Sequence, residues 1–343
     1  MWGQWLETSD FQRQVLTRLV GTDRWEEFKS CFNEYLKQHD APVWRYESHC
    51  GVVSKLDAFF SLRDEFTVEV LDRFYQTVAT VLQQPDTQAN VVELAGLGLP
   101  IVSRDQPLAR TRRQLMDTAA FLSKYGSQLL QRRCPDDFVK QGIDLMNALL
   151  QPLSVETLRQ VGTELPLLAE TAPGRFLRML EDDWKSSDSV IRDVLQDHTA
   201  TNDVLKEVLR AMAVVVQLSE DTFIRTCRLL GLWQTITPPE GGGRSAVERL
   251  LESLFTPENV GVIEPVNLPK ALQWVVKTFS EVGRVLCRRL MALADTLPEV
   301  LPTPQWNRIG RHKWTVEEKA AYRNKVGELL LSVTKLTAAE LKE

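Results

Sequence analysis

The feature that most limits what this chain can fold into is a three- and four-residue spacing of apolar side chains that recurs along its length. In two runs, one within 71–82 and one within 204–212, this spacing places all apolar residues on one face of a helix. The residues are Leu71, Phe74, Val78, Val81 and Leu82 in the first run, and Val204, Leu205, Val208, Leu209 and Met212 in the second. Alternating runs typical of strands are nearly absent, because even the best one, 260–266, is interrupted by Gly261 and Pro265. The pattern predicts an all-α chain.

Proline- and glycine-containing breaks separate segments of helical length, at a loose spacing of roughly 40 to 50 residues. This spacing is typical of stacked helix pairs, so an elongated, α-solenoid-like stack is expected, with two helical subdomains as an option. The longest irregular stretch supplies paired prolines and three glycines. We therefore expect a helical repeat-like region at 1–236, a linker or long loop at 237–244, and a C-terminal helical region at 245–343.

Composition excludes several classes of partner. The chain has 41 basic and 46 acidic residues and a net charge of -5, so it lacks the basic field that drives non-specific nucleic-acid binding. The longest apolar stretches, such as 211–216, are too short to span a bilayer, and no secretory signal is visible. Five scattered cysteines without a CxxC pair favour reduced thiols. A cytoplasmic protein without a membrane or nucleic-acid partner is expected.

Two groupings invite a chemical role. The first, Gly241–Ser245, could bind phosphate at a helix N-terminus, but prolines precede the glycines and no lysine follows, so the linker interpretation is favoured. The second contains Cys31, His39, His49 and Cys50, which could together hold zinc. Their spacing matches no standard zinc pattern, so scattered structural residues are favoured. A dispersed metal-dependent hydrolase using His39, His49 and nearby carboxylates stays open as an alternative.

Charged groupings yield one candidate contact site. The acidic run Glu181, Asp182 and Asp183 ends an apolar helix and is interpreted as a solvated helix end. Basic residues cluster at 110–113 and again near the C-terminus, where two tryptophans accompany them. This C-terminal set is the best local candidate for a phosphate-rich or protein partner, although an exposed charged loop is the simpler interpretation. Its members are Trp306, Arg308, Arg311, His312, Lys313 and Trp314.

One segment carries a family resemblance. Residues 164–184, ELPLLAETAPGRFLRMLEDDW, resemble a recurrent segment in the helical region that follows the nucleotide-binding core of bacterial antiviral STAND NTPases. Upstream, residues 51–59, 71–74, 81–86 and 108–122 resemble the family's preceding helices in the expected order. The family's effector and Walker-containing NTPase are not visible here, and the Trp-rich continuation after Leu205 has diverged.

The resemblance implies a non-catalytic helical scaffold without a cofactor. Such a region would recognise a phage protein, or support assembly with a companion defence protein, by contact alone. A nucleic-acid-binding helical protein that uses the C-terminal basic set is the other alternative. The sequence leaves open the target, the oligomeric state, and whether the chain is a fragment, a split-gene product or a stand-alone relative.

Overall fold

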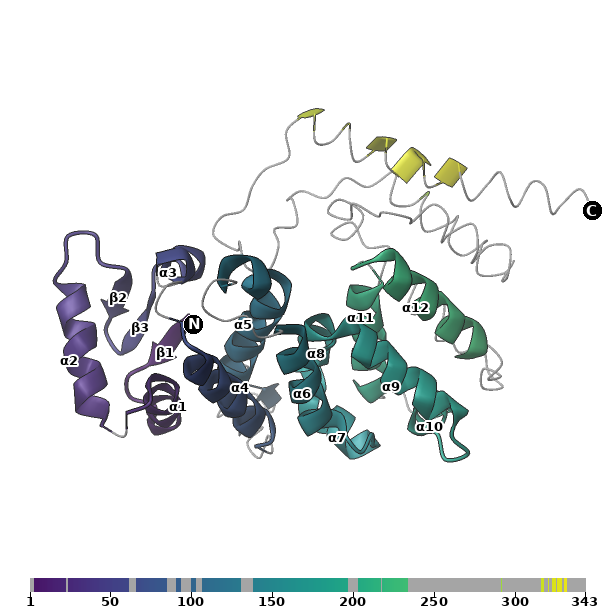
Figure 1. The fold of residues 1–343 in the computed structure, drawn as a ribbon, viewed down its shortest axis with the longest axis horizontal. Coiled ribbons are helices and arrows are strands. Elements are labelled where there is room, and N and C mark those ends of the chain that lie inside the picture. Colours follow the sequence, from purple (N-terminus) through teal and green to yellow (C-terminus); the bar gives the residue numbers. More distant parts are fainter. Residues whose placement is uncertain are drawn as a thin grey trace, which may run out of the picture. The chain divides into compact units, whose positions relative to one another are not determined.

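A computed structural model describes residues 3–22, 24–61, 66–84, 91–93, 100–102, 107–130, 138–196, 203–216 and 218–233, together with 291, 316–317, 320, 323–324, 326–328 and 330–331. These residues are mostly helical, which confirms the all-α class (Figure 1). The chain divides into two compact units, Met1–Ala172 and Pro173–Glu343. The expected linker at 237–244 lies outside the described residues. Within the described part, no helix is both long and apolar enough to cross a bilayer.

The first unit combines helices with short strands. The strands are β1 (Gln4–Leu6), β2 (Val43–Tyr46), β3 (His49–Val52), β4 (Val91–Glu93) and β5 (Pro100–Val102). The helices are α1 (Asp10–Val20), α2 (Trp25–Leu36), α3 (Lys55–Ser61), α4 (Val68–Leu82), α5 (Pro107–Leu130), α6 (Phe138–Leu150), α7 (Val155–Val161) and α8 (Leu165–Thr171), with a 3₁₀ turn η2 (Gly162–Glu164) before α8. Helix α5 packs against α1, α4, α6 and α8 and is the centre of the unit.

Helix α4 forms where the apolar spacing predicts it. The Thr67 side chain accepts a hydrogen bond from the Val70 amide, which caps the helix start. All five apolar residues of the predicted stripe are buried, and Phe74 and Val78 have no exposed surface. The stripe therefore faces the core against α1, α5 and α6.

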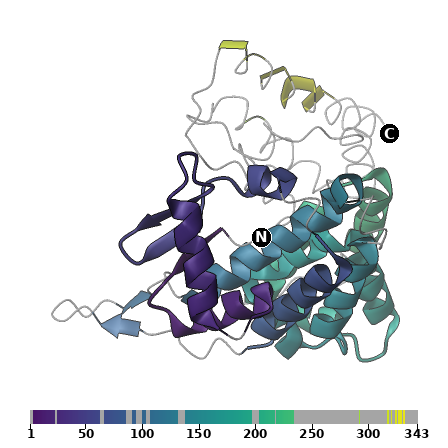
Figure 2. The ribbon, with the colours of Figure 1, turned by 60° about the vertical axis from the view of Figure 1, so that its left-hand side comes forward.

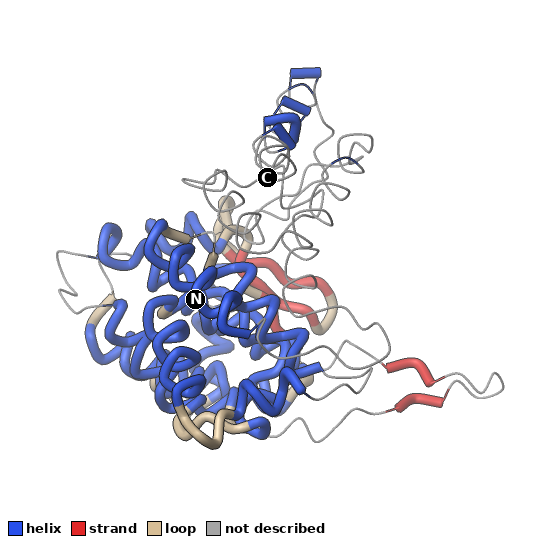
Figure 3. The backbone as a smooth tube through the Cα atoms, turned by 90° about the vertical axis from the view of Figure 1, so that its right-hand side faces the viewer, coloured by secondary structure: helices blue, strands red, loops and turns tan. Residues whose placement is uncertain are grey.

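Three of the strands form a small antiparallel sheet that the sequence pattern did not predict. Its order is β1-β3-β2, so the first strand of the chain and the hairpin β2–β3 meet in space (Figure 2). Strands β4 and β5 form a separate antiparallel pair (Figure 3). Residues 51–52, which the family resemblance placed in a helical region, belong to strand β3. The helical expectation is wrong at this point, because β3 is held by pairing with the distant β1 and with its hairpin partner β2 rather than by a local apolar stripe.

The second unit is described mainly by four helices, α9 (Pro173–Lys185), α10 (Val190–Gln196), α11 (Asp203–Val215) and α12 (Glu220–Trp233). The predicted apolar stripe of 204–212 is buried in α11. Helix α9 packs against α10 and α12, and α11 packs against the same two helices. These four helices thus close on one another, and an elongated solenoid stack stays a prediction.

Candidate functional site

A buried ion pair lies at the centre of the first unit. Arg112 of α5 and Glu164 of η2 have side chains only 4% and 7% exposed, and Arg112 Nε lies 3.5 Å from Glu164 Oε2. The Arg112 guanidinium also donates to the carbonyl oxygens of Gln160 and Val161, at the end of α7. Burial raises the pKa of Glu164, and the positive charge of Arg112 opposes that rise. Arg112, which the sequence placed in a basic group, is therefore a structural cation that joins α5 to the α7–α8 connection.

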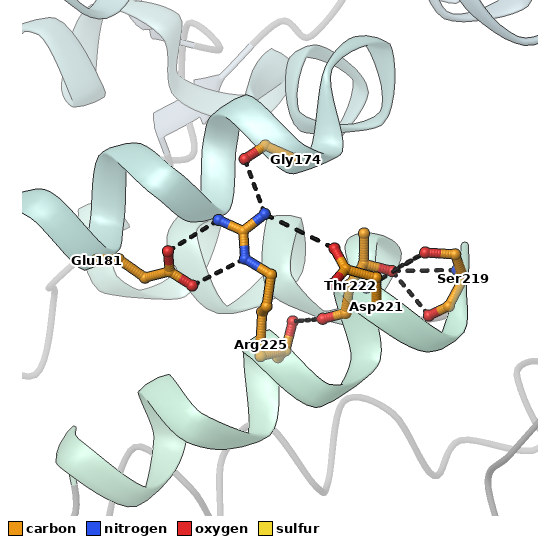
Figure 4. Close-up of polar contacts among 7 residues, drawn as sticks. Gly174, Glu181, Ser219, Asp221, Thr222 and Arg225 are labelled. Carbon is orange, nitrogen blue, oxygen red and sulfur yellow. Dashed lines mark hydrogen bonds and ion pairs between the residues drawn. The ribbon is translucent and has the colours of Figure 1, made fainter.

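A second arginine joins two helices of the second unit. Arg225 of α12 donates from Nε and Nη2 to the two carboxylate oxygens of Glu181 in α9, at 2.9 and 2.8 Å (Figure 4). The same guanidinium donates to the carbonyl oxygen of Gly174 at 3.2 Å and lies 3.8 Å from Asp221. These hydrogen bonds from Arg225 hold the pKa of Glu181 below its usual range. The bidentate pair fixes the position of α12 on α9.

The acidic run at the end of α9 is only partly a solvated helix end. Asp183 accepts hydrogen bonds from the Ser189 hydroxyl and from the amides of Val190 and Ile191, at 2.8 to 3.1 Å, and so caps the start of α10. Asp182 alone matches the expectation, because it is exposed and forms an exposed ion pair with Lys185. Linear spacing missed the roles of Glu181 and Asp183 because their partners come from other helices.

The first strand of the sheet has a closed outer edge. Its register with β3 directs the amides of Gln4 and Leu6 away from the sheet, since the Gly3 carbonyl accepts from Val52 of β3 and the Glu7 amide donates to the Ser48 carbonyl just before β3. The Gln4 amide donates to the side chain of Gln114, and the Leu6 amide donates to the side chain of Gln12 at 2.7 Å. Both outward amides of β1 are therefore satisfied by helices of the same unit.

The opposite edge, formed by β2 and called here the β2 edge (Val43–Tyr46), is different. Val53 donates to the Pro42 carbonyl, so alternate residues of β2 bond to β3, and the backbone groups of Val43 and Arg45 point outward. Among the described residues, these outward groups have no hydrogen-bond partner. Arg45 is exposed as a whole residue although its side chain is only 29% exposed, so much of that exposed area belongs to its backbone. No other strand of the described part of the chain pairs with the β2 edge, which is called open in this sense.

The two faces of the sheet also differ, because α2 packs on one face and aromatic side chains of β2 lie on the other. On one face, Phe32 of α2 contacts Trp5 edge-on, with ring centroids 5.1 Å apart, and Arg45 stacks over the same Phe32 ring. On the other face, Trp44 lies against Gly51 so closely that an added Cβ would be 2.7 Å from the indole, which requires glycine there. Tyr46 is 71% exposed on that face. Aromatic side chains thus stand beside the open edge, as in many protein-contact surfaces.

The Cys/His grouping does not assemble into a metal site. Cys50 is buried in β3, where burial raises the pKa of its thiol, while the His39 side chain is fully exposed beside Asp40. Cys31 is an exposed free thiol on α2. No group of three or more His, Cys, Asp or Glu in the described part of the chain could hold a metal ion. The alternative of a metal-dependent hydrolase based on His39 and His49 therefore lacks a metal-binding group among the described residues.

The C-terminal candidates lie outside the described residues. They comprise the basic and aromatic set Trp306, Arg308, Arg311, His312, Lys313 and Trp314, as well as the glycine-rich stretch 241–245. Their proposed contacts with a phosphate-rich or protein partner stay predictions. Comparison with protein-family models, curated proteins and solved structures found no match for this chain.

The sheet edge is the functional candidate that sequence reasoning missed. Little in the sequence indicates the β2–β3 hairpin, because its two-residue turn, Glu47 and Ser48, lacks the glycine typical of such turns. Glu47 takes the left-handed conformation, with a φ of 54°. A proline followed by Val-Trp-Arg-Tyr, with Gly51 five residues after the tyrosine, was the available hint. What this edge can do chemically is to bind another extended backbone by hydrogen bonds.

Proposed function

We propose that this chain is a non-catalytic helical scaffold, related to the helical region of antiviral STAND NTPases, that acts in the cytoplasm by binding proteins. It would recognise a phage protein or support assembly with a companion defence protein. The segment at 164–184, which carries the family resemblance, supplies the observation on which the proposal depends. That segment forms α8 and most of α9. Most of its apolar side chains are buried, and Leu165, Leu168, Phe176 and Leu177 have no exposed surface.

The charged residues that border this segment also have structural partners. Glu164 pairs with Arg112 in the first unit, and Glu181 pairs with Arg225 in the second. A recurrent segment whose apolar and charged residues both serve packing is what a scaffold requires, since recognition by shape needs a rigid framework rather than reactive groups. This supports a contact function for the surfaces that the framework carries.

Co-purification tests the recognition part of the proposal. The tagged full chain is co-expressed with phage terminase and portal proteins, one at a time, and retained protein is measured after washing. Recognition predicts retention of at least one of these proteins. Retention of none of them, from phages against which the complete host system protects, would contradict recognition.

A matched variant makes this experiment specific. Arg225→Ala removes the α9–α12 pair without changing the first unit, and Arg228→Ala removes an exposed arginine three residues along the same helix. If binding needs the folded scaffold of the second unit, Arg225→Ala reduces retention and Arg228→Ala does not. Equal retention by both variants would show that the captured protein does not depend on this scaffold.

The assembly part has a separate test. The product of a neighbouring gene that carries a Walker motif is co-expressed with the tagged chain, and the mass of the purified material is measured by light scattering. A defined complex of the two proteins is the expected result. Two separately eluting proteins would contradict assembly with that companion.

A further inference from the structure

We propose that the β2 edge pairs with the β2 edge of a second copy of this chain, in antiparallel register around a two-fold axis at Trp44. The pairing would join two three-stranded sheets into one six-stranded sheet. It deepens the assembly part of the proposed function and rests on it for its biological role. Its physical test needs only the purified chain.

The hydrogen-bonding pattern of the β2 edge is self-complementary. The outward backbone groups belong to Val43 and Arg45, two residues apart, with Trp44 between them. In an antiparallel pair centred on Trp44, Val43 of each copy lies opposite Arg45 of the other, and each such pair exchanges two N–H···O bonds. Four backbone hydrogen bonds therefore form without any change in the register of the sheet.

The side chains are compatible with the same register. Val43 and Arg45 share one face, so that each arginine meets a valine and no like charges stand opposite each other. On the other face, the two Trp44 residues lie opposite each other at the axis, with each indole turned over Gly51 of its own sheet, and Tyr46 lies opposite Pro42 of the other copy. An apolar and aromatic pairing is thus expected on this face.

The closed outer edge of β1 indicates that only one edge of the sheet is available for such growth. The side chains of Gln12 and Gln114 accept hydrogen bonds from the outward amides of β1. The outward backbone groups of β2 have no hydrogen-bond partner among the described residues. A heterologous contact through both edges would build an open filament, but a two-fold contact through β2 alone closes at a dimer. The strand is only four residues long, so the dimer is expected to be weak and dependent on concentration.

A charge-reversal pair at one position tests the register. In Val43→Lys, the new lysine of each copy faces Arg45 of the other, and in Val43→Glu the new carboxylate faces the same arginine. Both variants lose the same apolar side chain, so a purely structural effect would be alike in the two. Sedimentation of the full chain over a range of concentrations should give a dissociation constant lower for Val43→Glu than for Val43→Lys, by on the order of tenfold.

Cross-linking provides a second measurement that does not depend on charge. In a Cys31→Ser background, Trp44→Cys places two thiols opposite each other at the axis, where Cβ atoms of non-hydrogen-bonded pairs are about 4.5–5.5 Å apart. Tyr46→Cys is the matched control, because in this register the two copies of residue 46 are offset by four residues, roughly 13 Å. Mild oxidation should produce a covalent dimer with Trp44→Cys and little with Tyr46→Cys, and circular dichroism checks that both variants are folded.

The outcomes separate this inference from the proposed function. A chain that stays monomeric at all concentrations, or equal cross-linking at 44 and 46, overturns the two-fold pairing while leaving capture of a phage or companion protein unaffected. Equal dissociation constants for the two charge variants overturn the register. Failure of the capture experiments, with the dimer intact, overturns the proposed function and leaves the pairing in place.

Discussion

At the scale of single residues, buried polar side chains decide how the local elements meet. Gln12 of α1 has no exposed surface, yet its amide group accepts from Leu6 and donates to the Pro107 carbonyl and the Thr111 hydroxyl. One side chain thereby links β1, α1 and the start of α5. Nothing in the spacing of apolar residues marks Gln12 for this role, because its partners lie up to 99 positions away in the chain.

Replacing this glutamine should therefore be costly. Gln12→Leu leaves the Leu6 amide without its partner, whereas the Pro107 carbonyl keeps the hydrogen bond from the Thr111 hydroxyl. An unsatisfied buried group costs about 1–3 kcal/mol. We expect a loss of unfolding free energy of about that size or more in urea denaturation. Gln14→Leu, an exposed glutamine on the same helix, is the control and should change stability by no more than about 0.5 kcal/mol. Equal effects at the two positions would contradict the bridging role.

The pair of Glu181 and Arg225 predicts a dependence on pH. Hydrogen bonds from Arg225 lower the pKa of Glu181 from 4.5, so the carboxylate contributes stability that is present above pH 4.5 and is lost as pH falls through the lowered pKa. Glu181→Gln should thus be less stable than the natural chain at pH 7, by about 1–3 kcal/mol, and the difference should shrink below pH 4.5. Urea denaturation at several pH values measures it. A difference that does not vary with pH would contradict the charge-assisted bond.

At the scale of whole elements, close approach of backbones limits which residues fit. Helices α6 and α8 touch at Gly142, where an added Cβ would lie 2.7 Å from the carbonyl oxygen of Thr171. That oxygen belongs to the backbone of α8 and cannot move as a side chain does. The contact therefore needs glycine in the middle of α6, in spite of the cost of glycine to helix stability.

Adding one methyl group tests this contact. Gly142→Ala should push α6 and α8 apart and cost about 1–3 kcal/mol of unfolding free energy, measured by denaturation. Gly327 also has a helical backbone and has nothing within 4 Å of an added Cβ. Gly327→Ala should therefore be neutral or stabilising by up to about 1 kcal/mol. Stabilisation by both substitutions would show that the α6–α8 contact is looser than its geometry indicates.

At the scale of the whole molecule, the chain contains two compact units that join without a linker between their helices. Helix α8 ends at Thr171 and α9 begins at Pro173, so Ala172 alone separates them. Each unit has its own arginine–glutamate pair and its own apolar interior. A local change in one unit should therefore be felt mainly in that unit.

Hydrogen exchange measured by mass spectrometry can test this separation. Gln12→Leu should raise exchange in β1, α1 and α5 of the first unit, because it removes their common partner. Arg225→Ala should raise exchange in α9 and α12 of the second unit. Increases of equal size in both units for either variant would mean that the units unfold as one.

The sequence by itself determined the helices whose apolar residues recur every three to four positions. The stripes of α4 and α11 are local patterns, and each makes one face of a helix apolar before any partner is specified. The proline-containing breaks were legible for the same reason, since proline acts on its own neighbourhood, as it does at Pro152 between α6 and α7.

The tertiary structure alone decided the sheet, the arginine contacts and the open edge. Strand β3 exists because residues 4–6 and 43–46 flank it, and Glu181 is bonded rather than solvated because Arg225 arrives from 44 positions away. The same holds for the β2 edge, whose openness depends on which strand lies last in the sheet. Such features depend on contacts between distant residues, and no local spacing encodes them.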